Sequence, residues 1–163
     1  MENSGLQVPV FKIWGVTLVE LLVVVAVLAT LAGLGVAGYS SYRDTARINT
    51  SKQEIIEIAG LIDRYKLTTG NWPVSLDNIN QQNRIDPWGN NYIYAPIPAL
   101  IGNIVVGGTN IRQDANQRPI NTFYDLYSMG IDGETQSNIS AAVSKDDVIR
   151  ARDGDFIGLA SDY

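Results

Sequence analysis

The sequence predicts an α+β fold in which one long N-terminal helix packs on a small antiparallel β-sheet head. Three observations lead to this prediction. An uncharged run covers residues 21–38, apolar residues recur at helical spacing over 48–65, and short β candidates separated by turns fill the remainder. A chain of 163 residues has room for one compact domain and one long segment beside it.

The uncharged run is the strongest local signal in the sequence. Residues 21–38 hold about 18 apolar or small side chains in succession, which is just long enough for a transmembrane helix. A secretory signal peptide would carry a shorter apolar core and a small-residue exit, and no convincing exit precedes Tyr39. We therefore expect a membrane helix over residues 16–39.

The helix is expected to continue outside the membrane through residues 40–70. Apolar residues at helical spacing, with charged residues between them, indicate one apolar face. Gly70 and Pro73 together give a stop signal for the helix. The head must then cover the apolar face. Its members are Ile48, Ile55, Ile58, Ala59, Ile62 and Tyr65.

Residues 71–163 form the predicted head, which opens with a turn-rich stretch. An antiparallel sheet packed on the helix is the simplest architecture for it. The β candidates are residues 92–95, 103–106, 123–128 and 155–159. The long connection over 96–122 has two interpretations, a variable surface or a tolerated insertion.

Composition argues against an enzyme and against a nucleic-acid-binding protein. The chain has no Cys and no His, which removes thiolate and imidazole chemistry and the usual zinc ligands. Its formal net charge is −5, and no basic face is evident. Asp153 and Asp155 could be imagined as an acid/base pair, but R-D-G-D is more typical of a surface turn.

The residues at the head of the uncharged run carry a motif. Residues 15–20 read G-V-T-L-V-E, and the carboxylate of Glu20 needs a partner or a purpose so close to a membrane segment. The string resembles the prepilin processing site of the type IV pilin family, usually G-F-T-L-I-E. The resemblance implies that residues 1–15 are a leader, that prepilin peptidase cuts between Gly15 and Val16, and that Val16 becomes N-methylated.

The same resemblance gives Glu20 a role in assembly. A free α-amino group with a pKa of roughly 7.7 to 8.0 is mostly protonated near neutrality. Such a group on Val16 could pair with the Glu20 carboxylate of a neighbouring subunit and set the register between subunits. The alternative is an ordinary signal anchor with an incidental interfacial Glu.

Motifs in the head indicate which members of the type IV pilin family the sequence resembles. The strings are Y-K-L-T-T-G-N-W-P at 65–73, D-P-W-G-N-N-Y at 86–92 and S-M-G-I-D-G at 128–133. Together with the processing site they resemble the major pseudopilin of the type II secretion system. The resemblance implies a non-enzymatic filament subunit, held in the bacterial inner membrane by a single pass with its head in the periplasm, whose polymer drives protein export.

The resemblance also implies the partners. They are other copies of the chain in a helical homopolymer, prepilin peptidase, the inner-membrane assembly platform, minor pseudopilins and the membrane, with no nucleic acid among them. One alternative is a type IV pilus pilin or minor pilin, which would share the N-terminal motif. A monomeric signal-anchored binding domain is an alternative from another class.

The final expectation is a calcium ion in the C-terminal part of the head. Calcium takes six to eight oxygen ligands from carboxylates and backbone carbonyls. The D-G at 132–133 and the D-D-V at 146–148 are similar to the ligand-bearing strings of the major pseudopilins. The resemblance assigns Asp132 and Asp146 as side-chain ligands, followed by Asp147 and the carbonyls of Met129 and Glu134. The alternative is a solvated turn.

Overall fold

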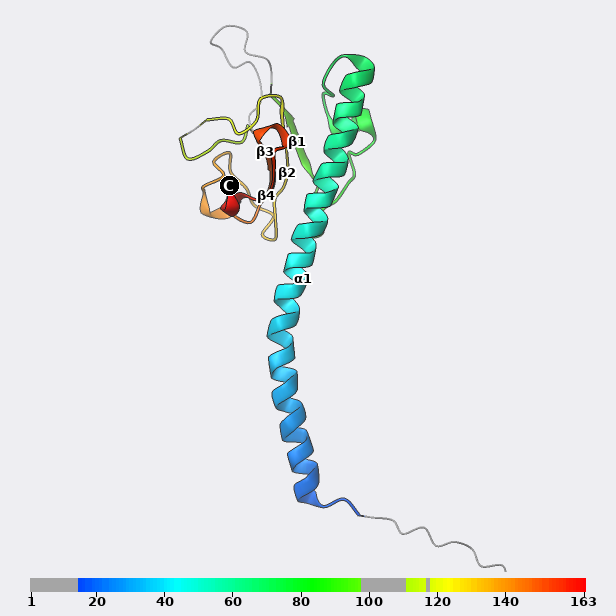
Figure 1. The fold of residues 1–163 in the computed structure, drawn as a ribbon, viewed down its shortest axis with the longest axis vertical. Coiled ribbons are helices and arrows are strands. Elements are labelled where there is room, and N and C mark those ends of the chain that lie inside the picture. Colours follow the sequence, from blue (N-terminus) through cyan, green and yellow to red (C-terminus); the bar gives the residue numbers. More distant parts are fainter. Residues whose placement is uncertain (1–14, 98–110, 117) are drawn as a thin grey trace, which may run out of the picture. The chain divides into compact units, whose positions relative to one another are not determined.

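The computed structural model describes residues 15–97, 111–116 and 118–163, without the side chains of 34–38. Helix α1, Leu18–Thr69, precedes a four-stranded antiparallel sheet, so the predicted α+β class is confirmed (Figure 1). The chain divides into two units, Met1–Tyr42 and Arg43–Tyr163. The β candidate at 103–106 and residues 1–14 of the predicted leader lie outside the described residues.

The first unit contains the beginning of α1. Thr17 precedes the helix, and its Oγ1 accepts the backbone N–H of Glu20 at 3.2 Å, which satisfies one free donor of the first turn. All described residues over 15–33 are exposed. Over the described residues, no helix is long and apolar enough to cross a membrane. The membrane segment expected at 16–39 stays a prediction.

The end of α1 lies at the expected stop. Thr69 is the last helical residue, and Gly70 follows with a φ of +79°. The N–H of Gly70 donates to the carbonyl of Lys66 at 2.9 Å, which satisfies one of the last carbonyls of the helix. Glycine suits this position because it has no Cβ to oppose a positive φ.

The sheet is a simple meander in which each strand pairs with the next. Its strands are β1 (Ile93–Pro96), β2 (Tyr124–Ser128), β3 (Val148–Ala151) and β4 (Phe156–Leu159). The predicted strands at 92–95, 123–128 and 155–159 are therefore confirmed to within a residue. Strand β3 was not predicted, because its four residues directly follow the D-D pair that was interpreted as part of a metal-binding loop.

One side of the sheet packs on the part of α1 that belongs to the second unit. The Ile55, Ile58 and Ile62 side chains have no exposed surface. They pack with Tyr124 and Leu126 of β2 in one apolar cluster. Burial of an isoleucine contributes roughly 1.5 to 3 kcal/mol, so this face is a principal source of stability. The predicted coverage of the apolar helix face is confirmed.

The opposite side of the sheet is covered as well, which the sequence did not predict. A second apolar cluster combines Tyr127 and Ile149 of the sheet with Ile120 and Ile139 from the connecting segments. All residues of β2 and β3 are consequently buried. A strand buried on both faces lacks the alternation that usually reveals it, which is a second reason why β3 was missed.

Candidate functional site

The candidate site is the C-terminal loop, defined here as residues 129–147 between β2 and β3. It contains all five residues that the calcium prediction names. Asp146 Oδ2 accepts the backbone N–H groups of Ile131 at 2.8 Å and of Asp132 at 3.2 Å. The two ends of the loop are therefore held together, and the carboxylate of Asp146 lies beside Asp132 although 14 positions separate them.

Asp132 also shapes the turn on which it lies. Its Oδ1 accepts the backbone N–H of Glu134 at 2.8 Å, an arrangement in which a short side chain closes its own turn. The carbonyl of Gly130 accepts a weaker hydrogen bond from Asn90 Nδ2 at 3.4 Å. Each of these contacts holds the loop by polar groups that belong to the chain itself.

Asp147 lies in a different environment from Asp146. Its side chain is fully buried and forms an ion pair with the guanidinium of Arg112. Thr135 Oγ1 donates a further hydrogen bond to Asp147 Oδ2 at 2.6 Å. Burial raises the pKa of Asp147 above its ordinary value, although Thr135 and Arg112 both act in the opposite direction. The carboxylate is therefore committed to a partner inside the head.

Arg112 is the residue that sequence reasoning missed. Its side chain is 1% exposed, and its guanidinium stacks on Tyr127 with its carbon 4.2 Å from the ring centroid. It donates to Thr135 Oγ1 and to the Gln136 carbonyl, while its backbone N–H donates to Asp125 Oδ2 at 2.7 Å. No local sequence signal marks this arginine, because its partners lie 13 to 35 positions away.

The position of Arg112 also clarifies the long connection at 96–122. Ile111, Arg112, Ile120 and Asn121 in its described part are buried in the head, whereas residues 115–116 and 118–119 between them are exposed. These four buried residues do not belong to a variable surface, and the tolerated insertion stays a prediction. Residues 98–110 and 117 lie outside the described part.

Asp125 on β2 belongs to a second cluster of buried polar side chains. Asn121 Nδ2 donates to Asp125 Oδ1 at 2.7 Å and to the carbonyl of Arg150 at 2.8 Å. Burial raises the pKa of Asp125, whereas the hydrogen bond from Asn121 lowers it. Arg150 stacks on Tyr124, with its guanidinium carbon 4.1 Å from the ring centroid. These contacts fasten the end of the 111–122 segment to the middle of the sheet.

Asp153 and Asp155 lie at exposed positions in the turn between β3 and β4. The Asp153 Oδ1 accepts the backbone N–H of Thr122 at 2.8 Å. Asp153 itself has a φ of +55°, a conformation that short polar residues tolerate in turns. The contact gives Asp153 a structural role in this turn.

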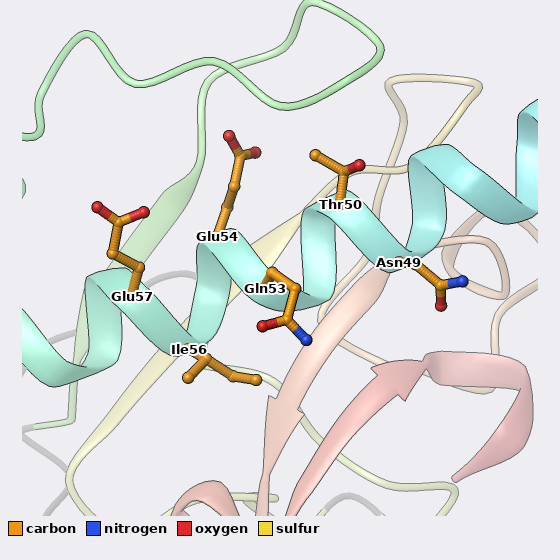
Figure 2. A pocket seen from close by; sticks show the side chains of 6 residues that line it. All are labelled: Asn49, Thr50, Gln53, Glu54, Ile56 and Glu57. Carbon is orange, nitrogen blue, oxygen red and sulfur yellow. The ribbon is translucent and has the colours of Figure 1, made fainter.

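A shallow hollow lies along α1 in the second unit, lined by Asn49, Thr50, Gln53, Glu54, Ile56 and Glu57. Figure 2 shows Glu54 and Glu57 pointing to one side of the helix and Ile56 to the other. Arg84 Nη2 pairs with Glu57 at 2.6 Å and with Glu54 at 3.4 Å. Its hydrogen bond and its charge lower the pKa of Glu57. The two carboxylates thus hold the 84–92 loop on the helix.

The calcium prediction can be compared with this geometry. Within the described residues, no three Asp or Glu side chains are close enough to form a metal-binding group. Asp147 does not fit the expected donor set, because Arg112 already neutralises it. Asp132 and Asp146 lie together, but each carboxylate has one oxygen engaged by the loop backbone. Calcium binding stays a prediction.

The three N-terminal candidates lie within the described residues, namely Gly15, Val16 and Glu20. Val16 is 71% exposed, and Glu20 lies exposed in the first turn of α1. Among the described residues, and apart from its chain neighbours, no atom lies within 4 Å of a Cβ position on Gly15. No protein-family model, curated protein or solved structure matches this chain. Its function must therefore be argued from these residues and from the motifs that they form.

Proposed function

We propose that the chain is a filament subunit of the type IV pilin kind, similar to the major pseudopilin of a type II secretion system. The observation that supports this most directly is the beginning of α1. Over 15–33 each described residue is exposed, and most of these side chains are apolar. A helix that is apolar all round requires lipid or other helices to cover it.

In the proposed role, lipid covers the apolar part of the helix before assembly, and other helices cover it afterwards. Before assembly, the run at 21–38 is held in the bacterial inner membrane as the membrane half of the helix, with the head in the periplasm. After assembly, the same side chains are covered by the helices of neighbouring subunits. The assembly platform moves the subunit from lipid into the filament, and minor pseudopilins take part in forming that filament.

Processing by prepilin peptidase supplies the charge that directs assembly. Cleavage after Gly15 leaves Val16 with an α-amino group that is mostly protonated near neutrality. That cation pairs with the Glu20 carboxylate of the next subunit, where low polarity strengthens the attraction and makes an unpaired charge costly. A contact between unlike groups on successive subunits produces an open helical polymer rather than a closed dimer.

The proposal assigns protein export to the polymer and no catalysis to the chain. The buried carboxylates of Asp125 and Asp147 have partners that fit a structural role, namely Asn121 and Arg112. Growth of the filament would push folded cargo outward through the secretion machinery. A surface pilus would use the same N-terminal chemistry and differ in where the filament ends.

Co-expression with a reconstituted type II secretion assembly system that lacks its own major pseudopilin tests the proposal. We expect filaments, restored export of a reporter cargo, and a subunit whose mass corresponds to a methylated chain beginning at Val16. A Gly15→Leu variant, which blocks the cut, should accumulate as an uncut membrane-bound precursor. An intact leader in the wild type, or a terminus beyond residue 38, would contradict the proposal. Filaments without export would favour the surface pilus.

A further inference from the structure

The guanidinium of Arg112 lies where three oxygen groups from two parts of the C-terminal loop converge. Thr135 Oγ1 and the Gln136 carbonyl come from the middle of the loop, and the Asp147 carboxylate comes from its end. We infer that Arg112 is the built-in cation that fastens this loop to the sheet, so that the loop holds its structure without a calcium ion.

The oxygen groups around Arg112 are of the types that calcium prefers. A carboxylate, a hydroxyl and a backbone carbonyl would each be suitable for a hard divalent cation. Here the guanidinium occupies the point at which they meet, and its planar fork suits several acceptors at once. Because the Arg112 side chain is only 1% exposed, solvent screens its ion pair with Asp147 very little.

The remaining polar atoms of the ion pair complement each other. Asp147 Oδ1 and Arg112 Nε are buried, and neither has a hydrogen-bond partner of its own among the described residues. One atom is an acceptor and the other is a donor, so a side-on second bond within the same pair would satisfy both. Nothing in this arrangement requires a cation other than the guanidinium.

Arg112 is also well anchored on its own side. Its backbone N–H donates to Asp125 Oδ2, and its guanidinium stacks on Tyr127, both on β2. Ile120 N–H donates to the Arg112 carbonyl at 3.1 Å. The cation is therefore attached to the sheet, and the loop is attached to the cation. The other attachment, Asp146 to the N–H groups of Ile131 and Asp132, likewise uses only groups of this chain.

Hydrogen exchange of the full chain in detergent micelles, read by mass spectrometry over 129–147, tests the inference. In the wild type, we expect the same exchange rates in millimolar calcium and in a calcium chelator. In Arg112→Met, we expect exchange over 131–136 to accelerate on the order of a hundredfold, because one partner of a buried ion pair is lost. Arg118→Met removes an exposed arginine of the same segment and should leave the rates unchanged.

Two further arms keep the test decisive if Arg112→Met fails to fold. Arg112→Ala with millimolar ethylguanidinium should recover slow exchange in the loop, whereas ethylammonium at equal concentration should recover much less because it lacks the planar fork. The wild-type comparison needs no variant. Chelator-dependent acceleration of about tenfold or more in the wild-type loop would overturn the inference and assign the role to calcium. Wild-type rates in Arg112→Met would also overturn it.

Discussion

Gly130 lies directly against Asp146, so that a Cβ atom on Gly130 would come within 2.4 Å of the Asp146 carbonyl oxygen and 2.5 Å of its Oδ2. The φ of Gly130 is +66°, a backbone angle that residues with a side chain rarely adopt. This close approach lets the Asp146 carboxylate reach the backbone N–H groups of Ile131 and Asp132. A glycine at this position therefore determines whether the loop can close.

Replacing Gly130 with alanine should destabilise the chain by roughly 2 to 5 kcal/mol. The positive φ contributes roughly 1 to 2 kcal/mol of strain, and overpacking typically adds 1 to 3 kcal/mol. Gly70→Ala is the matched control, because the φ of Gly70 is +79° and, apart from its chain neighbours, no atom of the described residues lies within 4 Å of its Cβ position. It should cost only the strain. Equal shifts of the two variants in urea unfolding would disprove the steric argument.

Tyr92 connects the loop over 84–92 to α1 through its hydroxyl. The OH donates to Glu54 Oε2 at 2.6 Å and lies 3.2 Å from Ser51 Oγ. Tyr92→Phe should cost roughly 1.5 to 3 kcal/mol, the usual range for a hydrogen bond to a charged group. Tyr94→Phe loses a neutral bond to the Pro73 carbonyl and should cost less. The reverse ranking in urea unfolding would refute this assignment.

Tyr124 should behave in the opposite way. Its side chain is fully buried, and within the part of the chain that the structure describes its hydroxyl has no hydrogen-bond partner. Removal of an unpaired buried hydroxyl is close to neutral or stabilising. Tyr124→Phe should therefore keep, or slightly exceed, wild-type stability at neutral pH. A loss above roughly 1 kcal/mol would indicate that the hydroxyl has a partner.

The same residue predicts how stability changes at alkaline pH. Burial raises the pKa of Tyr124 from 10.0 to about 12. Below pH 10 the Tyr124 hydroxyl is protonated in both states and does not make the free energy of unfolding depend on pH. As the pH rises toward 12 this free energy declines, because the unfolded state loses the Tyr124 proton first. Over that window the unfolding free energy of Tyr124→Phe should decline less steeply with pH than that of the wild type, by up to about 1.4 kcal/mol per pH unit. Parallel curves for the two proteins would exclude Tyr124 as a cause.

The parts of the fold that were predictable are those with a local signal. The buried positions Ile55, Ile58 and Ile62 follow helical spacing, and Gly70 marks the end of α1. Strand β3 had no comparable signal, since a four-residue strand buried on both faces shows no alternation. The position of β3 depends on the two strands beside it. Ile149 pairs with Tyr127 of β2 and with Gly158 of β4.

The candidate site divides in the same way. The D-G and D-D-V strings pointed to Asp132 and Asp146, and the structure places their polar groups together. The buried ion pair between Asp147 and Arg112 was not predictable, because Arg112 lies 35 positions earlier in a segment without a recognisable motif. Adjacent carboxylates in one string thus have different environments, a half-buried turn for Asp146 and a buried ion pair for Asp147.

The last prediction concerns Glu20, whose backbone N–H donates to Thr17 Oγ1. The spacing of Thr17 and Glu20 matches a capping box, so both residues could be present only to begin the helix. The proposed assembly role instead requires the negative charge of Glu20 to meet the α-amino group of a neighbouring subunit. Substitutions that separate charge from capping can distinguish these two explanations.

Glu20→Gln keeps a side chain suited to capping and removes the charge, whereas Thr17→Val removes the cap and keeps the charge. We expect Glu20→Gln to insert in the membrane at least as well as the wild type, since it lacks an ionised group, but to lower filament yield at least tenfold. Thr17→Val should lose only about 1 kcal/mol of helix stability and still assemble. Filament yield from sheared cells, with membrane fractionation alongside, measures both effects. If Glu20→Gln assembles normally while Thr17→Val does not, the motif at 17–20 is a helix cap, and the charge pair must be abandoned.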